Sequence, residues 1–333
     1  MKALVVCGKS ISDVIFATPT IRGLRIDIDD IAVHVLVHPE TSHLLRENPY
    51  IAKVHLFAGT FVTWRKLMDE RFDIIINLDE RWKSRFLLRF VTAPERRLST
   101  NRWKKWLMVK FKINQIASKH AVEHMLDVVR PLGVNGDNLG LDYFIPPHDM
   151  VSRQALPEAF RRGYVVFCIS ASFLTRKLPL DRMIELCDKI RRPIVLLGTS
   201  EDHDNAEVIW SFFSGSGPRR MQQNESVFAA RTHIYNACGK YSFNQMASII
   251  KQSLAVFTFD NDFVPVASAF RKQVFGLWGS TTSLFGNYPY RTRYTIMEHT
   301  DLECRPCSSQ GFDRCPKGHF KCMRDIMFDF YLP

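Results

Sequence analysis

Long apolar runs are absent from this chain of 333 residues, so the sequence offers no segment long enough for a membrane-spanning helix. The N-terminal stretch MKALVVCGKS also lacks the length and the small-residue cleavage site of a signal peptide, and it is typical of a first β-strand. We therefore expect the protein to remain in the cytoplasm. The composition, with 46% hydrophobic and 24% charged residues, is that of a globular protein, and the length favours two domains.

Acidic residues are scarce between Arg81 and Lys112, where eleven Lys or Arg residues accompany one acid, Glu95. This segment supplies nearly the whole net charge of +11. Aromatic residues are interleaved with the charges, namely Trp82, Phe86, Phe90, Trp103, Trp106 and Phe111. Such a basic segment predicts a polyanionic partner: an anionic membrane, a phosphorylated glycolipid or a nucleic acid. Because no nucleic-acid motif accompanies the charge, we expect no nucleic-acid partner.

Short apolar stretches alternate with helical patterns through both halves of the chain. The stretches cover residues 2–7, 31–37, 53–57 and 72–78, and then 164–169, 193–197, 254–259 and 273–278. Helical spacing lies between them, with a kink expected at Pro19 in the pattern of residues 14–25. The alternation predicts an α/β protein with two Rossmann-like domains and mostly parallel sheets. We place the domains at 1–150 and 151–333, with a linker around 146–157, and expect the polar stretch 214–231 to be mobile.

The most informative stretch runs from residue 239 to residue 282. It is read as helix, strand, turn, helix and strand, with Asp260-Asn261-Asp262 as the turn. In open parallel sheets, ligands bind beyond the carboxyl ends of the strands. Free backbone N–H groups at the start of the helix after Asp262 would favour a phosphate there. The plainer interpretation is a βαβ unit that only packs a core.

Seven of the eight cysteines fall into two groups, and the eighth, Cys238, lies next to a turn. Cys7, Cys168 and Cys187 lie in or beside apolar stretches and are expected to be small core residues. Four others gather near the C-terminus together with His319: Cys304, Cys307, Cys315 and Cys322. A structural zinc ion, free thiols and a disulfide or redox role all remain open for this group.

Several short motifs follow one another along nearly the full length: Ser12-Asp13-Val14 with Thr18-Pro19-Thr20-Ile21-Arg22, His120-Ala121-Val122-Glu123, Arg176-Lys177-Leu178-Pro179, Ala237-Cys238-Gly239-Lys240, the turn at Asp260 and the cysteine-rich tail. In this order they resemble glycosyltransferase family 9, the lipopolysaccharide heptosyltransferases. The resemblance implies the GT-B architecture, in which two Rossmann-like domains face a central cleft. A GT-B-like layout is also found in two-domain periplasmic binders and some epimerases.

The resemblance implies that a heptose passes from ADP-heptose, or a related nucleotide-sugar, to the lipopolysaccharide or lipooligosaccharide inner core, with inversion, without metal and without a required cofactor. The N-terminal domain would bind an anionic acceptor of the lipid A–Kdo type, and the C-terminal domain the donor. The protein would then work as a peripheral enzyme at the inner face of the cytoplasmic membrane.

The expected roles follow from this chemistry. Asp13 is the candidate base that removes the proton of the acceptor hydroxyl, although it could instead cap the helix beginning at Val14. Candidate donor-binding residues are Ser170, Ser172, Arg176, Lys177, Glu201, Lys240, Asp260, Asn261, Asp262 and Thr281. Candidate acceptor-binding residues are Ser10, Ser12, Arg81, Lys83, Arg85 and His120. Cations such as Arg176 would stabilise the departing diphosphate, whereas Asp202 and Asp204 compete with Glu201 for contact with a ribose.

The donor turn departs from the pattern of the family, which is Asp-Thr-Gly-Pro-x-His. Asp260 is kept, but Asp262 stands in place of the glycine and Pro265 in place of the histidine. Loss of the glycine removes a close backbone approach to phosphate, and Asp262 adds a negative charge. The alternative to an active transferase is therefore an eroded relative that binds a nucleotide or an anionic glycolipid without transfer.

Overall fold

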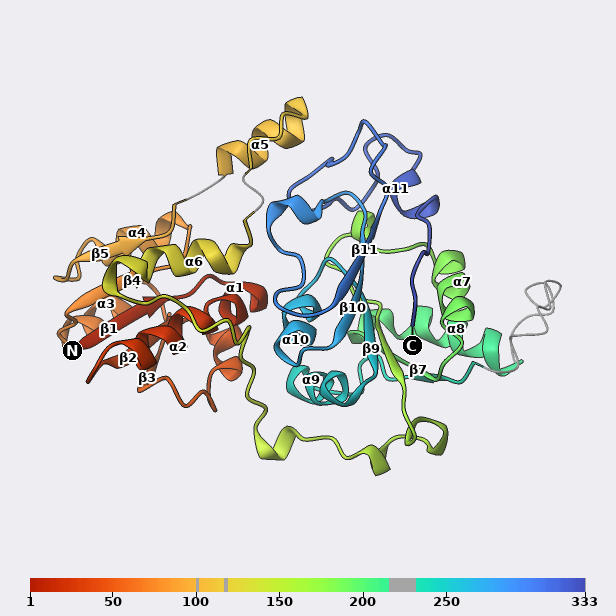
Figure 1. Ribbon diagram of the computed structural model, residues 1–333, viewed down its shortest axis with the longest axis horizontal. Helices are drawn as coiled ribbons and strands as arrows, with labels where there is room; N and C mark the ends of the chain where they lie inside the picture. Colours follow the sequence, from red (N-terminus) through yellow and green to blue (C-terminus); the bar gives the residue numbers. More distant parts are fainter. Residues whose placement is uncertain (100–101, 117–118, 216–231, 333) are drawn as a thin grey trace. The chain divides into compact units, whose positions relative to one another are not determined.

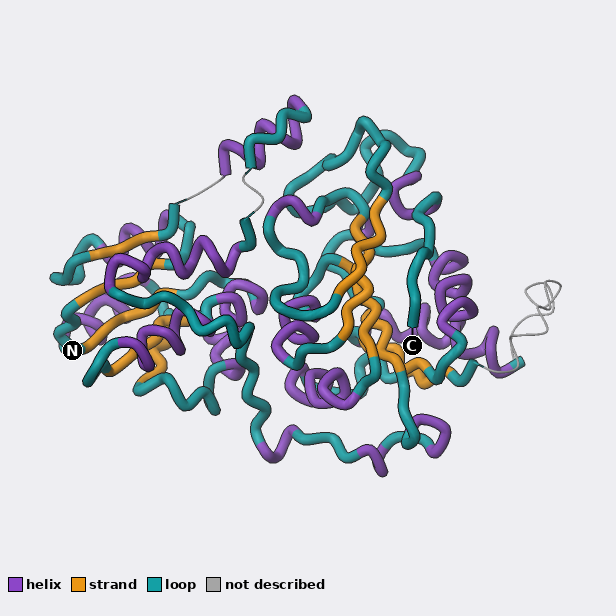
Figure 2. The backbone as a smooth tube through the Cα atoms, viewed as in Figure 1, coloured by secondary structure: helices purple, strands orange, loops and turns teal. Residues whose placement is uncertain are grey.

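The computed structural model describes residues 1–99, 102–116, 119–215 and 232–332, in two compact units (Figures 1 and 2). Unit 1 comprises Met1–Trp103 and Ile116–Pro146, and unit 2 comprises Lys104–Gln115 and Pro147–Pro333. Most of the stretch expected to be mobile, residues 216–231, lies outside the described residues. In the part that is described, no helix has the length and apolarity needed to cross a bilayer.

Unit 1 is built on a five-stranded parallel sheet in the order β3-β2-β1-β4-β5. Its strands are β1 (Lys2–Val6), β2 (Ala32–Val37), β3 (Lys53–Leu56), β4 (Ile74–Asn77) and β5 (Glu95–Arg97). Its helices are α1 (Ile11–Phe16), α2 (Thr18–Asp27), α3 (Thr60–Met68), α4 (Trp82–Leu88) and α6 (Ala121–Val129), with a 3-10 helix at Pro39–Leu44. The central strands β1 and β4 are almost completely buried, which explains their continuous apolar sequences.

Unit 2 carries a six-stranded parallel sheet in the order β11-β10-β9-β6-β7-β8. The strands are β6 (Val165–Cys168), β7 (Ile194–Leu197), β8 (Ile234–Asn236), β9 (Ala255–Phe259), β10 (Gln273–Trp278) and β11 (Tyr294–Glu298). The α-helices are α7 (Leu180–Ile190), α8 (His203–Ser214), α9 (Phe243–Gln252), α10 (Phe263–Ala269) and α11 (Lys321–Arg324). Figure 2 shows the two groups of strands in orange. The predicted α/β class with parallel sheets is therefore confirmed.

The N-terminal helical region differs from the prediction in its starting point. The helix was expected to begin at Val14, but α1 begins at Ile11 because Ser10 is its N-cap. The kink expected at Pro19 is a complete break, since Ala17 separates α1 from α2 and Pro19 lies in the first turn of α2. Between β2 and β3 the chain forms the 3-10 helix Pro39–Leu44.

A buried arginine ties α2 to the loop that follows α6. Arg22 is 1% exposed. Its guanidinium donates to both carboxylate oxygens of Asp137, at 2.5 and 2.8 Å, to the carboxylate of Asp142, and to the carbonyl of Gly140 at 2.8 Å. These three hydrogen-bond partners belong to unit 1, as Arg22 does, so the guanidinium links two segments within that unit.

Helix α5 (Arg102–Phe111) is followed by a turn that is anchored on the C-terminal part of unit 2. The ammonium of Lys112 donates to the carbonyls of Cys304, at 2.9 Å, and Pro306, at 2.7 Å. Lys105 lies over the ring of Phe285, 5.7 Å from its centroid. Part of the basic segment therefore packs with residues nearly two hundred positions further along the chain.

Candidate functional site

In unit 1, the candidate base lies directly after β1, at the carboxyl edge of the sheet. Asp13 occupies the third position of α1 and forms a reciprocal capping box with Ser10. The Asp13 N–H donates to the Ser10 hydroxyl at 3.0 Å, and the Ser10 N–H donates to a carboxylate oxygen of Asp13 at 3.2 Å. The carboxylate also lies against Gly8, since a Cβ added there would come within 2.6 Å of its Cγ. Asp13 is thus held in one orientation and is half-buried.

A second carboxylate, in the stretch after β4 where ligand contacts were expected but not among the candidate site residues, is that of Asp79. Asp79 is 4% exposed and accepts hydrogen bonds from the Arg81 guanidinium, at 2.8–3.1 Å, and from the Ser84 hydroxyl. The Arg81 guanidinium also lies 2.7 Å from Nε2 of His38. Burial, followed by the charge of Arg81, lowers the pKa of His38. The sequence feature that marks Asp79 is its position directly after the buried strand β4, because ligands bind beyond such strand ends.

The other acceptor-side candidates are less enclosed, with one exception. Ser10, Lys83 and Arg85 are exposed, and Ser12 is half-buried. His120 is 3% exposed, and its Nδ1 accepts a hydrogen bond from the Val122 N–H at 3.1 Å as the N-cap of α6. Its ring also meets the ring of Phe16 edge-on, with centroids 5.2 Å apart. The contacts of His120 are those of a helix cap, and an acceptor-binding role stays a prediction.

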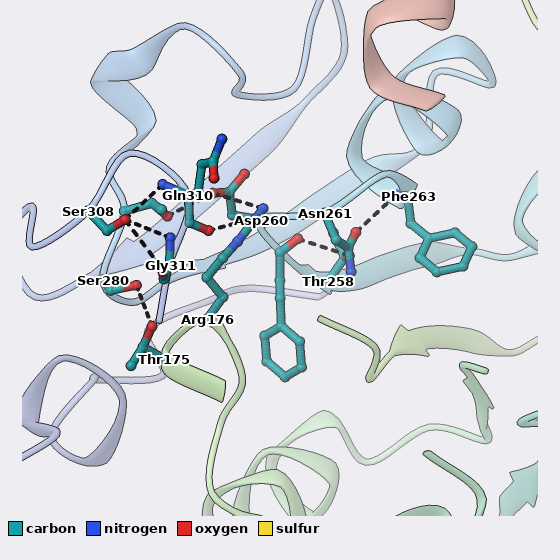
Figure 3. Close-up of polar contacts among 12 residues, drawn as sticks. Thr175, Arg176, Thr258, Asp260, Asn261, Phe263, Ser280, Ser308, Gln310 and Gly311 are labelled. Atoms are coloured by element: carbon teal, nitrogen blue, oxygen red, sulfur yellow. Dashed lines mark hydrogen bonds and ion pairs between the residues drawn. The ribbon is translucent and has the colours of Figure 1, made fainter. Parts of the chain in front are cut away.

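In unit 2, an ion pair joins the loop after β6 to the end of β9 (Figure 3). The guanidinium of Arg176 lies 3.1 Å from the carboxylate of Asp260, and it also donates to the Gln310 carbonyl at 3.1 Å. The Thr281 hydroxyl, beyond β10, donates to Asp260 at 2.7 Å. Burial raises the pKa of Asp260, against the opposing effects of Arg176 and Thr281.

A second ion pair lies beside the first and involves an acid that the sequence interpretation did not choose. Asp202 accepts hydrogen bonds from the Lys177 ammonium and the Ser170 hydroxyl, and from Thr199 through its N–H and hydroxyl, both at 3.1 Å. Burial would raise the pKa of Asp202, but the hydrogen bonds from Lys177 and Ser170 outweigh it and lower that pKa. Glu201 is exposed. The spacing Thr199-x-x-Asp202 forms a capping box and was the signal for this residue.

Asn261 lies between the two ion pairs, and Figure 3 shows its hydrogen bond with Phe263 at the start of α10. Its side-chain N–H donates to the Ser170 carbonyl at 2.8 Å, while its side-chain oxygen accepts from the Phe263 N–H at 2.9 Å. Its own carbonyl accepts from the Val264 N–H at 3.2 Å, and the next residue, Pro265, has no N–H. The expectation of free N–H groups at this helix start is therefore wrong, because Asn261 already binds the first two.

The remaining donor-side candidates lie around this network. Asp262 is half-buried at the N-cap of α10, whereas Ser172 and Lys240 are exposed. The ammonium of Lys240 lies over the ring of Tyr235, 4.9 Å from its centroid. The network therefore unites Ser170, Arg176, Lys177, Asp260, Asn261 and Thr281, but not Ser172, Glu201 or Lys240.

The three cysteines that were predicted to be core residues are buried, and the cysteines of the tail are not arranged like the ligands of a metal ion. Cys7, Cys168 and Cys187 are buried, and all eight cysteines are free thiols. In the tail, Sγ of Cys304 lies 3.7 Å from Nε2 of His319. Among the described residues, the tail does not bring three metal-ligand atoms within 4.8 Å of one another. The arrangement thus gives no support to a structural zinc ion there.

Comparison with known proteins gives consistent matches over most of the chain. The family model described as glycosyltransferase family 9 (heptosyltransferase) matches residues 61–314. Lipopolysaccharide heptosyltransferase 3 of Escherichia coli K12 is 22% identical over 294 residues, which are 82% of this chain and 81% of the relative.

Solved structures share the fold at low identity. A family 9 glycosyl transferase from Veillonella parvula matches with a TM-score of 0.69 and 18% identity, over 90% of this chain and 86% of that chain. The ADP-heptose lps heptosyltransferase II of E. coli matches with a TM-score of 0.66 and 14% identity, over 98% of both chains. The E. coli heptosyltransferase WaaC, solved with ADP, matches with a TM-score of 0.64 and 18% identity, over 89% and 93%.

Proposed function

The chain belongs to glycosyltransferase family 9, the heptosyltransferases, and from this premise we propose that it transfers a heptose from ADP-heptose to the inner core of lipopolysaccharide. Related proteins support the choice of donor and acceptor: WaaC was solved with ADP and with an ADP-2-deoxy-2-fluoro heptose, and the E. coli relative is named a lipopolysaccharide heptosyltransferase. We place the protein in the cytoplasm, with its acceptor presented by the membrane.

One observation carries the donor half of the proposal. Polar side chains from the ends of four neighbouring strands, β6, β7, β9 and β10, form two adjoining hydrogen-bonded clusters at the carboxyl edge of the second sheet, and these meet at the Asp260–Asn261 peptide bond. In open α/β sheets this edge is where ligands bind. Arg176 and Lys177 supply two cations there, as the departing diphosphate requires in the absence of a metal.

The altered donor turn defines how the donor would be held. Because Asn261 satisfies the first N–H groups of α10, the phosphates would be bound by side chains rather than by this helix start. Arg176 is paired with Asp260, whose pKa is raised by burial. Binding of a diphosphate would exchange this carboxylate partner for phosphate oxygens, which the fork of an arginine can hold in pairs.

The acceptor half rests on Asp13. In the proposed step, the Asp13 carboxylate takes the proton of the acceptor hydroxyl while that oxygen attacks the anomeric carbon, and the bond to the diphosphate breaks on the opposite face. The configuration is thereby inverted. The capping box with Ser10 and the close approach to Gly8 fix the orientation that a base needs.

The test separates chemistry from donor binding. Asp13→Asn should lower turnover about 10²–10⁴-fold and leave the affinity for ADP unchanged, whereas Arg176→Met should weaken ADP binding. Glu158→Gln, an exposed carboxylate that is not among the candidate site residues, serves as the control and should change neither. Unchanged turnover in Asp13→Asn would remove the base from this role. A chain that binds ADP but never forms product would instead be the eroded, non-transferring relative.

We further propose that α4 docks on an anionic membrane. Trp82 and Phe86 are 69% and 51% exposed, one helical turn apart, and Phe90 just after the helix is 50% exposed. Exposed Lys83 and Arg85 belong to the same helix. Aromatic rings at headgroup level with adjacent cations match the chemistry of an anionic bilayer surface.

Vesicle sedimentation tests the docking. Trp82→Ser with Phe86→Ser should reduce binding to phosphatidylglycerol vesicles, whereas Phe61→Ser, an equally exposed aromatic outside the basic segment, should not. Binding to an oligonucleotide in place of vesicles, or equal binding to neutral vesicles, would contradict the proposal.

A further inference from the structure

Two buried histidines and a glutamate meet on one face of the first sheet. His34 on β2 and His55 on β3 share that face, because His34 pairs with Lys53, and Leu36 with His55, in the parallel register. Nδ1 of His34 lies 3.0 Å from Nε2 of His55. A carboxylate oxygen of Glu70, from the turn between α3 and β4, lies 3.9 Å from Nδ1 of His34. The three ligand atoms lie within 4.8 Å of one another.

The two imidazoles are held in place by packing. They are 6% and 8% exposed and stack on each other, with centroids 5.2 Å apart. Phe72 meets both rings edge-on, at centroid distances of 5.4 and 6.0 Å. Burial lowers the pKa of each ring, to about 4 for His55. A neutral imidazole carries one nitrogen lone pair that can bind a metal.

We propose that Nδ1 of His34, Nε2 of His55 and a carboxylate oxygen of Glu70 form a site for a divalent transition-metal ion such as Zn²⁺. Two imidazoles and a carboxylate are a ligand set that such ions accept, with a further position left for water. For metal–ligand bonds of about 2.0–2.1 Å, neighbouring tetrahedral ligand atoms stand about 3.3 Å apart. The separations of 3.0 and 3.9 Å lie on either side of this value. On binding, the ring that now donates the hydrogen bond between the two imidazoles would carry its proton on its other nitrogen, and the ion would take the place of that hydrogen bond.

Two lysines set the strength of the site. The Lys2 ammonium lies 2.9 Å from one oxygen of Glu70, and Lys53 pairs with the other oxygen. Their positive charges repel a cation, so the affinity should be modest. Removing Lys53, whose side chain is 56% exposed, should therefore tighten metal binding about tenfold.

The position of the site indicates a structural role. β3 is the edge strand of the sheet and pairs only with β2 among the described strands. A metal held by β2, β3 and the turn before β4 would cross-link that edge. The site is separate from the carboxylates that follow β1 and β4, so it takes no part in the proposed transfer.

Cobalt titration of the full chain tests the site. The chain should carry Cys304→Ser and Cys307→Ser, to weaken competition from the tail thiols. We expect one Co²⁺ per chain with visible ligand-field bands, and no near-ultraviolet thiolate charge-transfer absorption. His55→Gln should weaken binding at least about 100-fold. The control is His148→Gln, whose side chain is 76% exposed and which should bind as before.

Two further readouts decide the result. Zn²⁺ should raise the melting temperature of the chain but not that of His55→Gln, and Lys53→Met should bind Co²⁺ more tightly. If His55→Gln does not fold, Lys53→Met decides, because a purely structural Lys–Glu pair predicts no gain in affinity. Cobalt spectra with thiolate bands only, or equal affinities in His55→Gln and His148→Gln, would overturn the proposal.

Discussion

Replacing Arg22 with methionine should destabilise unit 1 more than any surface change in the same helix. Methionine keeps the length of the side chain but leaves Asp137 and Asp142 without their cation. The side chain of Asp142 is 16% exposed and that of Asp137 is 32% exposed, so water compensates only in part. Breaking a buried ion pair from one side costs about 3–5 kcal/mol.

The assay is thermal unfolding followed by circular dichroism. For a unit of this size, 3–5 kcal/mol corresponds to a fall of about 10–15 °C in the melting temperature. Arg25→Met, an exposed arginine of the same helix α2, is the matched control and should change it by less than about 2 °C. Adding Asp142→Asn to Arg22→Met should restore part of the loss, because it removes one of the unpaired charges.

Two results would refute this reasoning. Arg22→Met could have the same melting temperature as the control Arg25→Met. In that case water solvates the two carboxylates well enough to replace the guanidinium. Arg22→Met with Asp142→Asn could also have a lower melting temperature than Arg22→Met alone. In that case the loss of stability comes from packing rather than from unpaired charge.

Three other changes follow, two at strand ends and one in the core of unit 2. Gly8→Ala should lower turnover about 100-fold with little change in melting temperature, because the new Cβ displaces the carboxylate of Asp13. Full turnover in a kinetic assay would show that the reaction does not depend on this position of the carboxylate. Asp202→Asn should cost about 3–5 kcal/mol at pH 7 in urea titrations, since it leaves Lys177 buried without a partner. The folded pKa of Asp202 is lowered, so its contribution is present above its unfolded pKa of about 4 and is lost as the pH falls through the folded value. The difference in free energy of unfolding between the unchanged chain and Asp202→Asn should therefore decrease below about pH 4. A difference that stays constant with pH would show that the charge of Asp202 is not involved. Phe257→Ala, in the core of unit 2, should cost about 3–5 kcal/mol by the same assay.

The sequence was sufficient for the central strands and for the edge strand β3, but the edge strands β5, β8 and β11 were missed. β1, β4, β6, β7, β9 and β10 are buried, so their continuous apolar runs revealed them. β5 was missed because its sequence, Glu95–Arg97, is charged and largely exposed, as an edge strand can be. β11 was missed for the same reason, since it is buried at only one position. A strand is recognised from the pattern of its buried apolar residues, and β5 and β11 have few buried residues.

The candidate site was predictable in its location but not in its pairings. Alternating strands and helices placed the polar residues at strand ends, which is why Arg176 and Asp260 were both chosen. Their ion pair joins residues 84 positions apart, and no local pattern encodes such a contact. The inward orientation of Asp202 had a local signal, the capping-box spacing Thr199-x-x-Asp202, whereas the ribose contact of the exposed Glu201 stays a prediction.

The assignment of Lys104–Gln115 to unit 2 has a practical consequence for dissecting the protein. The chain passes between the units three times, so no single cut separates them. A fragment starting at Pro147 would lose Lys112 and leave the carbonyls of Cys304 and Pro306 without its ammonium, while the complementary fragment would expose the helix that carries it. Expression of either half alone would therefore report on a damaged molecule, and interdomain questions are better asked of the intact polypeptide.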